Sequence, residues 1–215
     1  MKIDGCGKAK VLSPEEIQLL FDEGLETIRD KTLCAVMLYT ACRVNECVLL
    51  KIKDVFDRRG RIRPEIVFRK NNTKGKLATR VIPVADDLRY YLEEYDPQYL
   101  YDSHLFPGRW ERGHLHQDFA SIIVRRAFRK IDVVGAATHS FRRTALTQMS
   151  NAGIPLRVIQ EISGHRNLEQ LQKYLEVKPE QVRGAIASLS MLSPVTRKDT
   201  RTEDVNTRVP SETPF

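Results

Sequence analysis

The sequence lacks the features that mark membrane-spanning and secreted proteins. None of its apolar runs approaches the ~18 residues that a membrane-spanning helix needs, and the longest useful one is Ala35–Tyr39. The N-terminus shows no secretory signal pattern, and we find no internal repeat. Aromatic residues are few, at 7%, but a hydrophobic fraction of 41% argues against global disorder. These absences exclude a transmembrane helix and leave a folded protein with no membrane partner as the expectation.

Cysteine is scarce, and its spacing does not suit a metal site. The four cysteines are Cys6, Cys34, Cys42 and Cys47. None of them forms a CxxC pair, and the last two have no histidine nearby. We therefore expect no zinc and no other cofactor, and reduced thiols in a cytoplasmic protein are the simplest interpretation.

Positive charge is present and is gathered in two stretches. The formal net charge of the 215 residues is +7. Lys51–Arg80 holds 11 basic and 3 acidic residues, and Arg125–Arg143 holds 6 and 1. Between them, Val81–His104 holds 6 acidic residues and 1 basic residue. This pattern indicates a polyanion bound on one face. Charge that only keeps the protein soluble is the plainer alternative.

The patterns predict an α+β domain that is predominantly helical, with a small three-stranded antiparallel sheet. Ser13-Pro14-Glu15-Glu16 has the residue types of a capped helix start. Strands are predicted over Ile52–Phe56, Glu65–Arg69 and Thr79–Val84. Further helices are predicted over residues 29–40, 45–50, 86–95, 117–130, 140–151, 155–163, 167–177 and 179–192.

This pattern gives a linker over residues 1–12, one domain over 13–192 and a disordered polar tail over 193–215. Helix 117–130 is expected to be amphipathic. Its core face is predicted to hold Phe119, Ile122, Ile123 and Ala127, followed by Ile131, with Arg125, Arg126 and Arg129 outward.

Four short fragments stand in a fixed order along the chain. Arg43 lies in Thr40-Ala41-Cys42-Arg43-Val44-Asn45-Glu46, and His139 precedes Arg142 by three residues. Gly164-His165 follows, and Tyr174 comes nine residues after His165. This ordered set, with a basic hairpin between its first two members, resembles the tyrosine recombinase (phage integrase) family from about Leu12 to Leu192.

The resemblance implies the recombinase catalytic-domain fold and site-specific DNA cleavage and rejoining without metal or ATP. Arg43 and Arg142 would clamp the scissile phosphate, because a guanidinium binds two oxygens at once and stays charged. Glu46, three residues after Arg43, would hold that guanidinium in place. A surface ion pair is the ordinary alternative for either arginine.

The resemblance assigns the remaining chemistry to two histidines, a tyrosine and a lysine. His139 would act beside the phosphate as a proton acceptor or a hydrogen-bond donor, and His165 would hydrogen-bond a phosphate oxygen. Tyr174 would be the nucleophile and would form a 3′-phosphotyrosyl link. Lys70, Lys74 and Lys76 compete for the role of general acid to the leaving 5′ oxygen. The hairpin match favours Lys74, and Lys76 remains open as the main alternative.

Other basic residues are expected to contact DNA phosphates, which gives affinity with little sequence information. They are Arg58, Arg69, Lys76, Arg125, Arg126, Arg129 and Arg143. The resemblance also implies double-stranded DNA as partner and a homo-oligomer, a tetrameric synapse, docked through helix 179–192. Such a protein would lie in the cytoplasm, on the nucleoid when it is bound to DNA.

Two residues depart from the family pattern. Ala41 stands where the family usually has glycine, and Ser163 stands where an apolar residue usually precedes Gly164. The additional N-terminal DNA-binding domain of most members has no counterpart here, so the chain resembles a short form or a catalytic fragment. A regulator of the same fold without activity and a type IB topoisomerase are the alternative functions.

Overall fold

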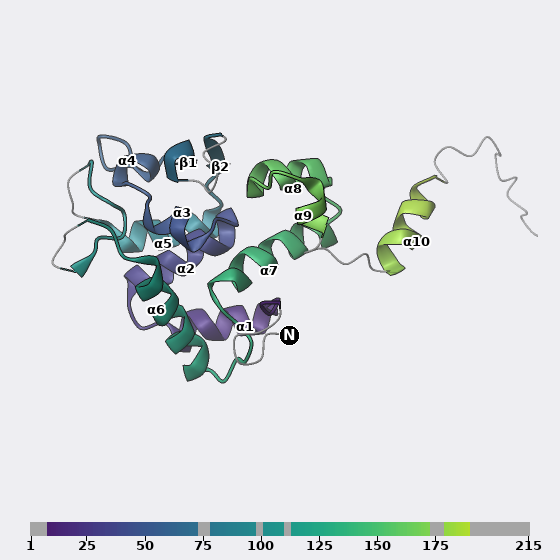
Figure 1. The fold of residues 1–215 in the computed structure, drawn as a ribbon, viewed down its shortest axis with the longest axis horizontal. Helices are drawn as coiled ribbons and strands as arrows, with labels where there is room; N and C mark the ends of the chain where they lie inside the picture. The colour runs from purple at the N-terminus through teal and green to yellow at the C-terminus, as the bar shows by residue number, and fades with distance from the viewer. Residues whose placement is uncertain (1–7, 73–77, 98–100, 110–112, 173–178, 190–215) are drawn as a thin grey trace, which may run out of the picture. The chain divides into compact units, whose positions relative to one another are not determined.

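A computed structural model describes residues 8–72, 78–97, 101–109, 113–172 and 179–189. The chain divides into two compact units, Met1–Glu176 and Val177–Phe215. The second unit contributes one described helix, α10 (Pro179–Ser188) (Figure 1). The core and the candidate site lie in the first unit. No helix in the described ranges is long and apolar enough to cross a membrane.

The helices begin close to where the sequence predicts them. Ser13 Oγ accepts a hydrogen bond from the Glu16 N–H at 3.2 Å, and Glu16 Oε2 accepts one from the Ser13 N–H at 3.1 Å, which completes the predicted capping box. The helices of this unit are α1 (Pro14–Leu19), which continues as a π-helical turn (Leu20–Gly24), α2 (Ile28–Thr40), α3 (Val44–Val48), α4 (Ile52–Val55), α5 (Asp86–Tyr95), α6 (Gln117–Lys130), α7 (Thr138–Asn151), α8 (Leu156–Ser163) and α9 (Leu168–Gln172).

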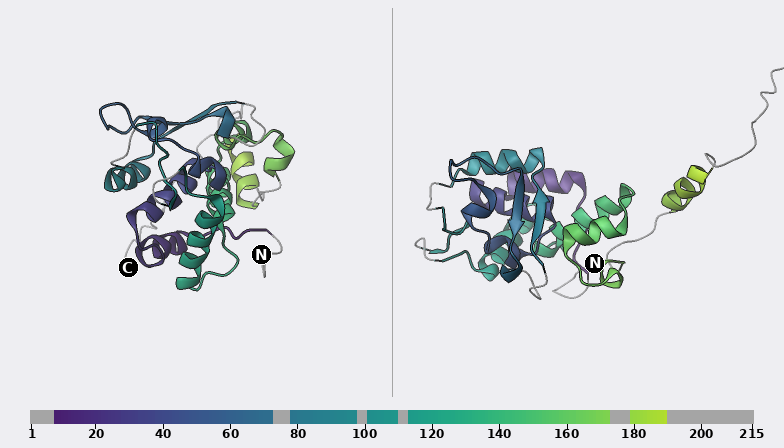
Figure 2. Two further views of the ribbon diagram at one scale, coloured as in Figure 1. Left: turned by 60° about the vertical axis from the view of Figure 1, so that its left-hand side comes forward. Right: turned by 90° about the horizontal axis from the view of Figure 1, so that it is seen from above.

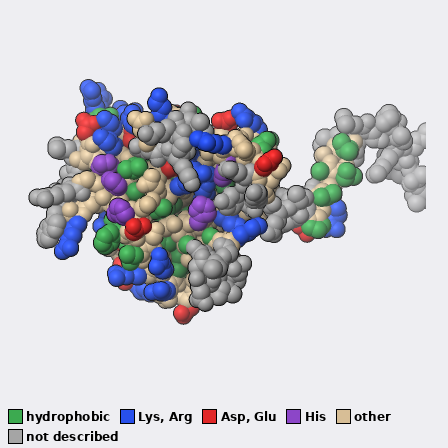
Figure 3. Space-filling model, viewed as in Figure 1, with side chains coloured by type: hydrophobic (Ala, Val, Ile, Leu, Met, Phe, Trp, Pro, Cys, Tyr) green, Lys and Arg blue, Asp and Glu red, His purple; other side chains and the backbone are tan. Residues whose placement is uncertain are grey.

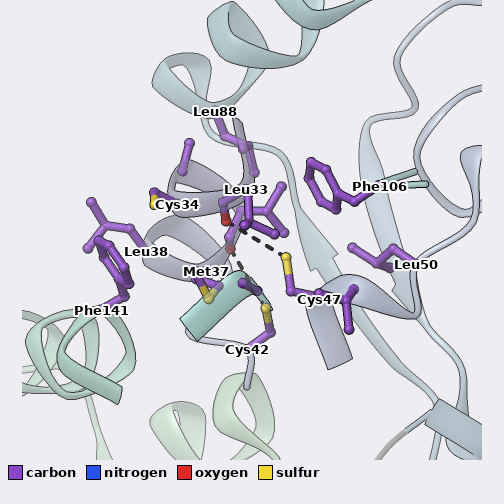
Figure 4. Packing of buried hydrophobic residues seen from close by; sticks show 14 of the residues in the cluster. Leu33, Cys34, Met37, Leu38, Cys42, Cys47, Leu50, Leu88, Phe106 and Phe141 are labelled. Carbon is purple, nitrogen blue, oxygen red and sulfur yellow. Dashed lines mark hydrogen bonds between the residues drawn. The ribbon is translucent and has the colours of Figure 1, made fainter. Parts of the chain in front are cut away.

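Helix α2 lies at the centre of this unit, between α5 and α7 (Figures 1 and 2). Almost every residue from Thr32 to Thr40 is buried. Three of the four cysteines lie in this core as thiols, and Figure 4 shows Cys42 and Cys47 close to Met37. The Cys47 thiol donates to the Leu33 carbonyl at 3.7 Å, and burial raises the pKa of this thiol well above its usual value. These cysteines therefore act as small apolar residues.

The sheet has two strands in the described part of the chain, and the prediction of a third was wrong. Strands β1 (Glu65–Phe68) and β2 (Arg80–Pro83) pair antiparallel, with Phe68 opposite Arg80. The predicted first strand forms α4 instead. The carboxylate of Asp54 causes this difference, because it accepts from the Lys51 N–H at 3.1 Å and closes the first helical turn.

Helix α6 has the predicted bounds, but its buried face is rotated from the predicted one. Phe119 is 63% exposed and Ile122 is 37% exposed. The buried side chains are Ala120, Val124, Ala127, and Phe128. A Cβ on Gly24 would lie 3.1 Å from the Ala127 carbonyl oxygen, so the π-helical turn approaches α6 closely at Ala127. This approach leaves little room for a side chain at position 24.

Candidate active site

Arg43 and Glu46 are joined at the start of α3. Arg43 is the residue just before the helix, and its N–H donates to Glu46 Oε2 at 3.0 Å. Its guanidinium donates to Glu46 Oε1 at 3.1 Å. The Glu46 side chain is 2% exposed and that of Arg43 is 26% exposed. The carboxylate therefore anchors an arginine whose other donors remain near the surface.

Arg80 is a second cation on the same carboxylate, and it was not singled out from the sequence. Its Nη2 donates to Glu46 Oε2 at 2.6 Å, and its guanidinium lies 5.2 Å from the centre of the Phe68 ring. The sequence signal that could have identified Arg80 is the alternation of buried and exposed side chains along a strand. Arg80 and Ile82 share the buried face of β2, whereas the side chains between and after them are exposed.

Gly164 provides the space for Arg80. It ends α8 with φ at +63°, a conformation that glycine adopts without strain. A Cβ on Gly164 would lie 2.7 Å from Cδ and 2.9 Å from Nε of Arg80. The side chain of Arg80 also donates to the Ile162 carbonyl, just before this turn. A side chain at position 164 would therefore displace Arg80.

Arg142 is buried, and its described partners are neutral groups. It projects inward from α7 and is 1% exposed. Its Nη1 donates to the Ala41 carbonyl at 2.6 Å and its Nη2 to the Ser163 carbonyl at 2.8 Å. Burial, with Arg43 and Arg80 as like charges, lowers the pKa of Arg142 to about 9, although Glu46 opposes the shift. The guanidinium stays charged at neutral pH but is poorly compensated.

His165 covers Arg142. Arg142 Nη2 lies 3.2 Å from Nε2 and 3.4 Å from Nδ1 of the imidazole. Burial is the largest cause that lowers the pKa of His165, and the charges of Arg142, Arg43, Arg80 and His139 follow in that order; together they lower it to about 3. At neutral pH the imidazole is therefore uncharged and stands between a buried cation and the surface.

Arg43, Glu46, Arg80, Arg142 and His165 form the cluster at the centre of the site. The other predicted residues lie at the edge of this cluster or outside the described residues. His139 is exposed in the first turn of α7, and its effect on the pKa of His165 places it within electrostatic reach. Lys74, Lys76 and Tyr174 lie outside the described residues.

The predicted DNA contacts differ in how they are held. Arg58 is exposed. Arg69 is half exposed, and its Nε donates to Asp54 at 2.7 Å. Arg143 is half-buried and donates to the Ala9 carbonyl at 2.6 Å, so it also ties the N-terminal segment to α7. The three exposed arginines of α6 are Arg125, Arg126 and Arg129. Lys and Arg side chains are spread over the face in Figure 3, with histidines near its middle.

A cleft of about 410 Å³ opens over the cluster, between β2 and the end of α8. Arg43, Arg80 and His165 line it together with Glu46, and Arg157 and Arg166 stand at its wall. Arg142 is not among the lining residues, because His165 covers it. In the described part of the chain, no group of three or more histidine, cysteine or acidic side chains is arranged to hold a metal ion. The cleft is suited to an anion.

The sequence model of the phage integrase family matches residues 10–181. The chain belongs to the phage integrase family. Among curated relatives, the tyrosine recombinase XerD of Yersinia pestis is 31% identical over 164 residues, which cover 73% of this chain and 52% of that protein. The tyrosine recombinase XerA of Pyrococcus horikoshii is 25% identical over 192 residues, which cover 86% of this chain and 63% of that protein.

Solved structures of the integrase family share the fold. A crystal structure of XerA recombinase has a TM-score of 0.65 at 23% identity and covers 87% of this chain and 64% of its own. XerH site-specific recombinase, bound to its difH substrate before cleavage, has a TM-score of 0.65 at 20% identity. The match covers 86% of this chain and 56% of the XerH chain. The chain thus spans about half to two thirds of the length of the integrase-family proteins it matches.

Proposed function

We propose that the chain cleaves and rejoins DNA at specific sites through a transient bond to Tyr174, without metal or ATP. One observation carries the proposal. Three guanidinium groups, those of Arg43, Arg80 and Arg142, lie around a single carboxylate, that of Glu46. This leaves an excess of two positive charges. A phosphodiester carries one negative charge and gains a second as phosphorus is attacked, so the excess favours the transition state.

Each described residue has a role in this scheme. Arg43 has donors at the edge of the cleft that can bind a non-bridging oxygen. Arg142 acts from behind the imidazole of His165, across an interior with little water, where charges interact strongly. His165 donates a hydrogen bond to the phosphate. His139 stands at the rim as proton acceptor or donor.

Tyr174 supplies the nucleophile in the proposal. Its phenol oxygen attacks phosphorus, and the bond from phosphorus to the 5′ oxygen breaks. The phenol has an ordinary pKa near ~10, so neighbouring cations must stabilise the phenolate, and His139 accepts the proton that the phenol loses. The products are a 3′-phosphotyrosyl link and a 5′-hydroxyl, which takes its proton from Lys74. Attack by a 5′-hydroxyl reverses the step and rejoins a strand, so no ATP is consumed.

The proposed partners are double-stranded DNA in the cytoplasm and further copies of the chain. Relatives in the family include XerH, whose structure is of a complex with its difH substrate. In α10, the side chains of Val182 and Ile186 are 52% and 65% exposed, and Leu189 follows at 54%. This apolar side supports docking of 179–192 on a neighbouring copy in a tetrameric synapse.

A nicked suicide substrate tests the proposed function. The probe is DNA from beside the gene that contains inverted repeats, incubated in EDTA and analysed for an SDS-stable adduct. We expect an adduct with the wild-type chain and none with Tyr174→Phe, while DNA binding persists. Tyr90→Phe is the matched control, because Tyr90 is an exposed tyrosine of α5. An adduct that survives in Tyr174→Phe contradicts the assignment of the nucleophile.

The same substrate separates the alternative functions. DNA binding without an adduct at any site would indicate a regulator. Relaxation of supercoiled DNA of any sequence would indicate a type IB topoisomerase, whereas a recombinase requires paired sites.

A sulfur-containing substrate identifies the general acid. We expect Lys74→Ala to abolish cleavage of ordinary DNA and to be rescued by a 5′-bridging phosphorothioate, because a thiolate leaves without a proton. Cleavage rates on the two substrates measure the rescue. Lys76→Ala is the comparison, and rescue of that variant instead would move the role to Lys76.

A further inference from the structure

Ser163 is a buried hydroxyl placed beside the imidazole of His165. It is the last residue of α8 and is fully buried. Gly164 follows in the left-handed conformation, so the chain reverses and brings His165 back next to the serine. Ser163 Oγ then lies 2.8 Å from His165 Nδ1. This is a short, direct hydrogen bond within a site that the proposed function uses.

The hydroxyl proton of Ser163 has two described acceptors, and their geometry is unequal. The carbonyl of Gln160 lies 3.3 Å from Ser163 Oγ, which is long for a hydroxyl donor. That carbonyl already accepts from the Gly164 N–H at 2.7 Å. Nδ1 of His165 is closer. Because Nδ1 is closer and the Gln160 carbonyl already has a donor, the Ser163 hydroxyl donates its hydrogen bond to Nδ1.

Arg142 does not compete for the in-plane lone pair of either ring nitrogen of His165. Its Nη2 is nearly equidistant from the two, at 3.2 and 3.4 Å. A donor on the lone-pair axis of one ring nitrogen would be much farther from the other, across the ring. The guanidinium group therefore lies against the ring face, where a planar cation stacks favourably. Among the described residues, Ser163 is therefore the donor placed to bind the Nδ1 lone pair.

We propose that Ser163 is a positioning residue that donates to Nδ1 of His165 and so holds the ring proton on Nε2. The inference rests on the proposed function and deepens it. With the proton on Nε2, the neutral imidazole is a hydrogen-bond donor to an anionic oxygen in the cleft. The other tautomer would direct a lone pair at that oxygen and repel it.

The local structure keeps this arrangement in place. Gln160 Nε2 donates to the backbone carbonyls of His165 and Arg166 at 3.0 and 3.2 Å. Its Oε1 accepts from Arg157 at 3.0 Å. The turn after α8 is therefore held from one side by Gln160 while Ser163 orients the ring. An apolar residue at position 163 would leave the ring without its Nδ1 donor.

Nitrogen NMR of the whole chain labelled with ¹⁵N-histidine tests the inference, and His165→Gln identifies the signals of His165. We expect Nδ1 without a proton and Nε2 with one in the wild type. In Ser163→Ala, both signals should move toward the average of the two tautomers. Thr32→Val is the control, because it removes another buried hydroxyl, whose described partners are the Ile28 and Tyr91 carbonyls.

Two results would overturn the inference. One is a proton on Nδ1 of His165 in the wild type. The other is an unchanged tautomer in Ser163→Ala. If that variant does not fold, Ser163→Cys takes its place, because a thiol is a much weaker donor and should shift the same signals. The wild-type measurement alone remains able to refute the proposal.

Cleavage of the suicide substrate gives the functional readout. We expect adduct formation by Ser163→Ala to be slower by about 10- to 100-fold, the loss usual when a hydrogen bond that orients a metal-binding histidine is removed. An unchanged rate would show that Ser163 sets the tautomer without aiding catalysis and would overturn its positioning role. If the wild type forms no adduct, the proposed function fails, and the NMR result still decides the tautomer.

Discussion

The two buried arginines of the site, Arg80 and Arg142, differ in whether a carboxylate partner balances their charge. Arg80 has a carboxylate partner, Glu46, at 2.6 Å. Arg142 has two carbonyls and the face of a neutral histidine. Both side chains are less than a tenth exposed. The charge of Arg80 is therefore balanced within the protein, whereas that of Arg142 is left for a ligand.

Because of this difference, the two halves of the cluster have separate roles. The half around Glu46 fixes the positions of two guanidinium groups, because one carboxylate binds Arg43, just before α3, and Arg80, on β2. The half around Arg142 supplies uncompensated charge beneath the cleft. A site in which every cation had a carboxylate would fold more readily but would attract a phosphate less.

Removal of the Glu46 charge should have the largest effect on folding. Glu46→Gln leaves Arg80 buried without an anion, and breaking a buried pair on one side costs about 3–5 kcal/mol. Urea denaturation measures the loss in the free energy of unfolding. Glu161→Gln removes the exposed partner of Arg157 in α8 and should cost less than about 1 kcal/mol. Equal losses for the two variants would show that Glu46 does not anchor the cluster.

The half around Arg142 should make stability depend on pH through His165. The native pKa is lowered to about 3, and an unfolded histidine titrates near ~6.5. As pH falls through this window, the unfolded chain binds a proton that the native chain does not. Stability should then fall by up to about 1.4 kcal/mol per pH unit.

Denaturation series at several pH values measure this slope. We expect the slope between pH ~6.5 and ~3 to be smaller in His165→Gln, because the titrating group is gone. His116→Gln is the control, because His116 is exposed, and it should keep the wild-type slope. A slope in His165→Gln that equals the wild-type slope would contradict a buried neutral imidazole.

The smallest effect is expected at Ala41, whose carbonyl holds Arg142. Ala41 is fully buried and has φ at +51°. Ala41→Gly relieves about 1–2 kcal/mol of left-handed strain and loses about 0.8 kcal/mol of methyl burial. We therefore expect a net change in unfolding free energy within about 1 kcal/mol. Ala35→Gly, inside α2, loses both the methyl burial and helix propensity and should cost about 2 kcal/mol. Similar losses at both positions would show that Ala41 is unstrained.

Much of the helical fold could be predicted from the sequence because its start and stop signals are local. Ser13 and Gly164 mark helix ends by their own chemistry, and α5 and α6 have the predicted bounds. The errors arose where tertiary contacts decide. Asp54 caps a β-prone segment and makes it α4, and the buried face of α6 is the one that packs on the π-helical turn, where Gly24 approaches the Ala127 backbone.

The site could be predicted only as far as a motif extends along the chain. Arg43, Arg142 and His165 were selected by their order and spacing. Arg80 was missed because its partner Glu46 lies 34 positions away, although the alternation along β2 places Arg80 on the buried face with Ile82. The role of Ser163 depends on the turn at Gly164, so the sequence showed only that the residue type departs from the family pattern.

Mapping the covalent link tests the central claim most directly. The adduct formed on the suicide substrate in EDTA is trimmed with nuclease and protease, and mass spectrometry locates the residue that carries the nucleotide. Our account predicts a nucleotide phosphate on the phenol oxygen of Tyr174 alone. A nucleotide attached to any other side chain, or DNA cleaved without a covalent link, would contradict it.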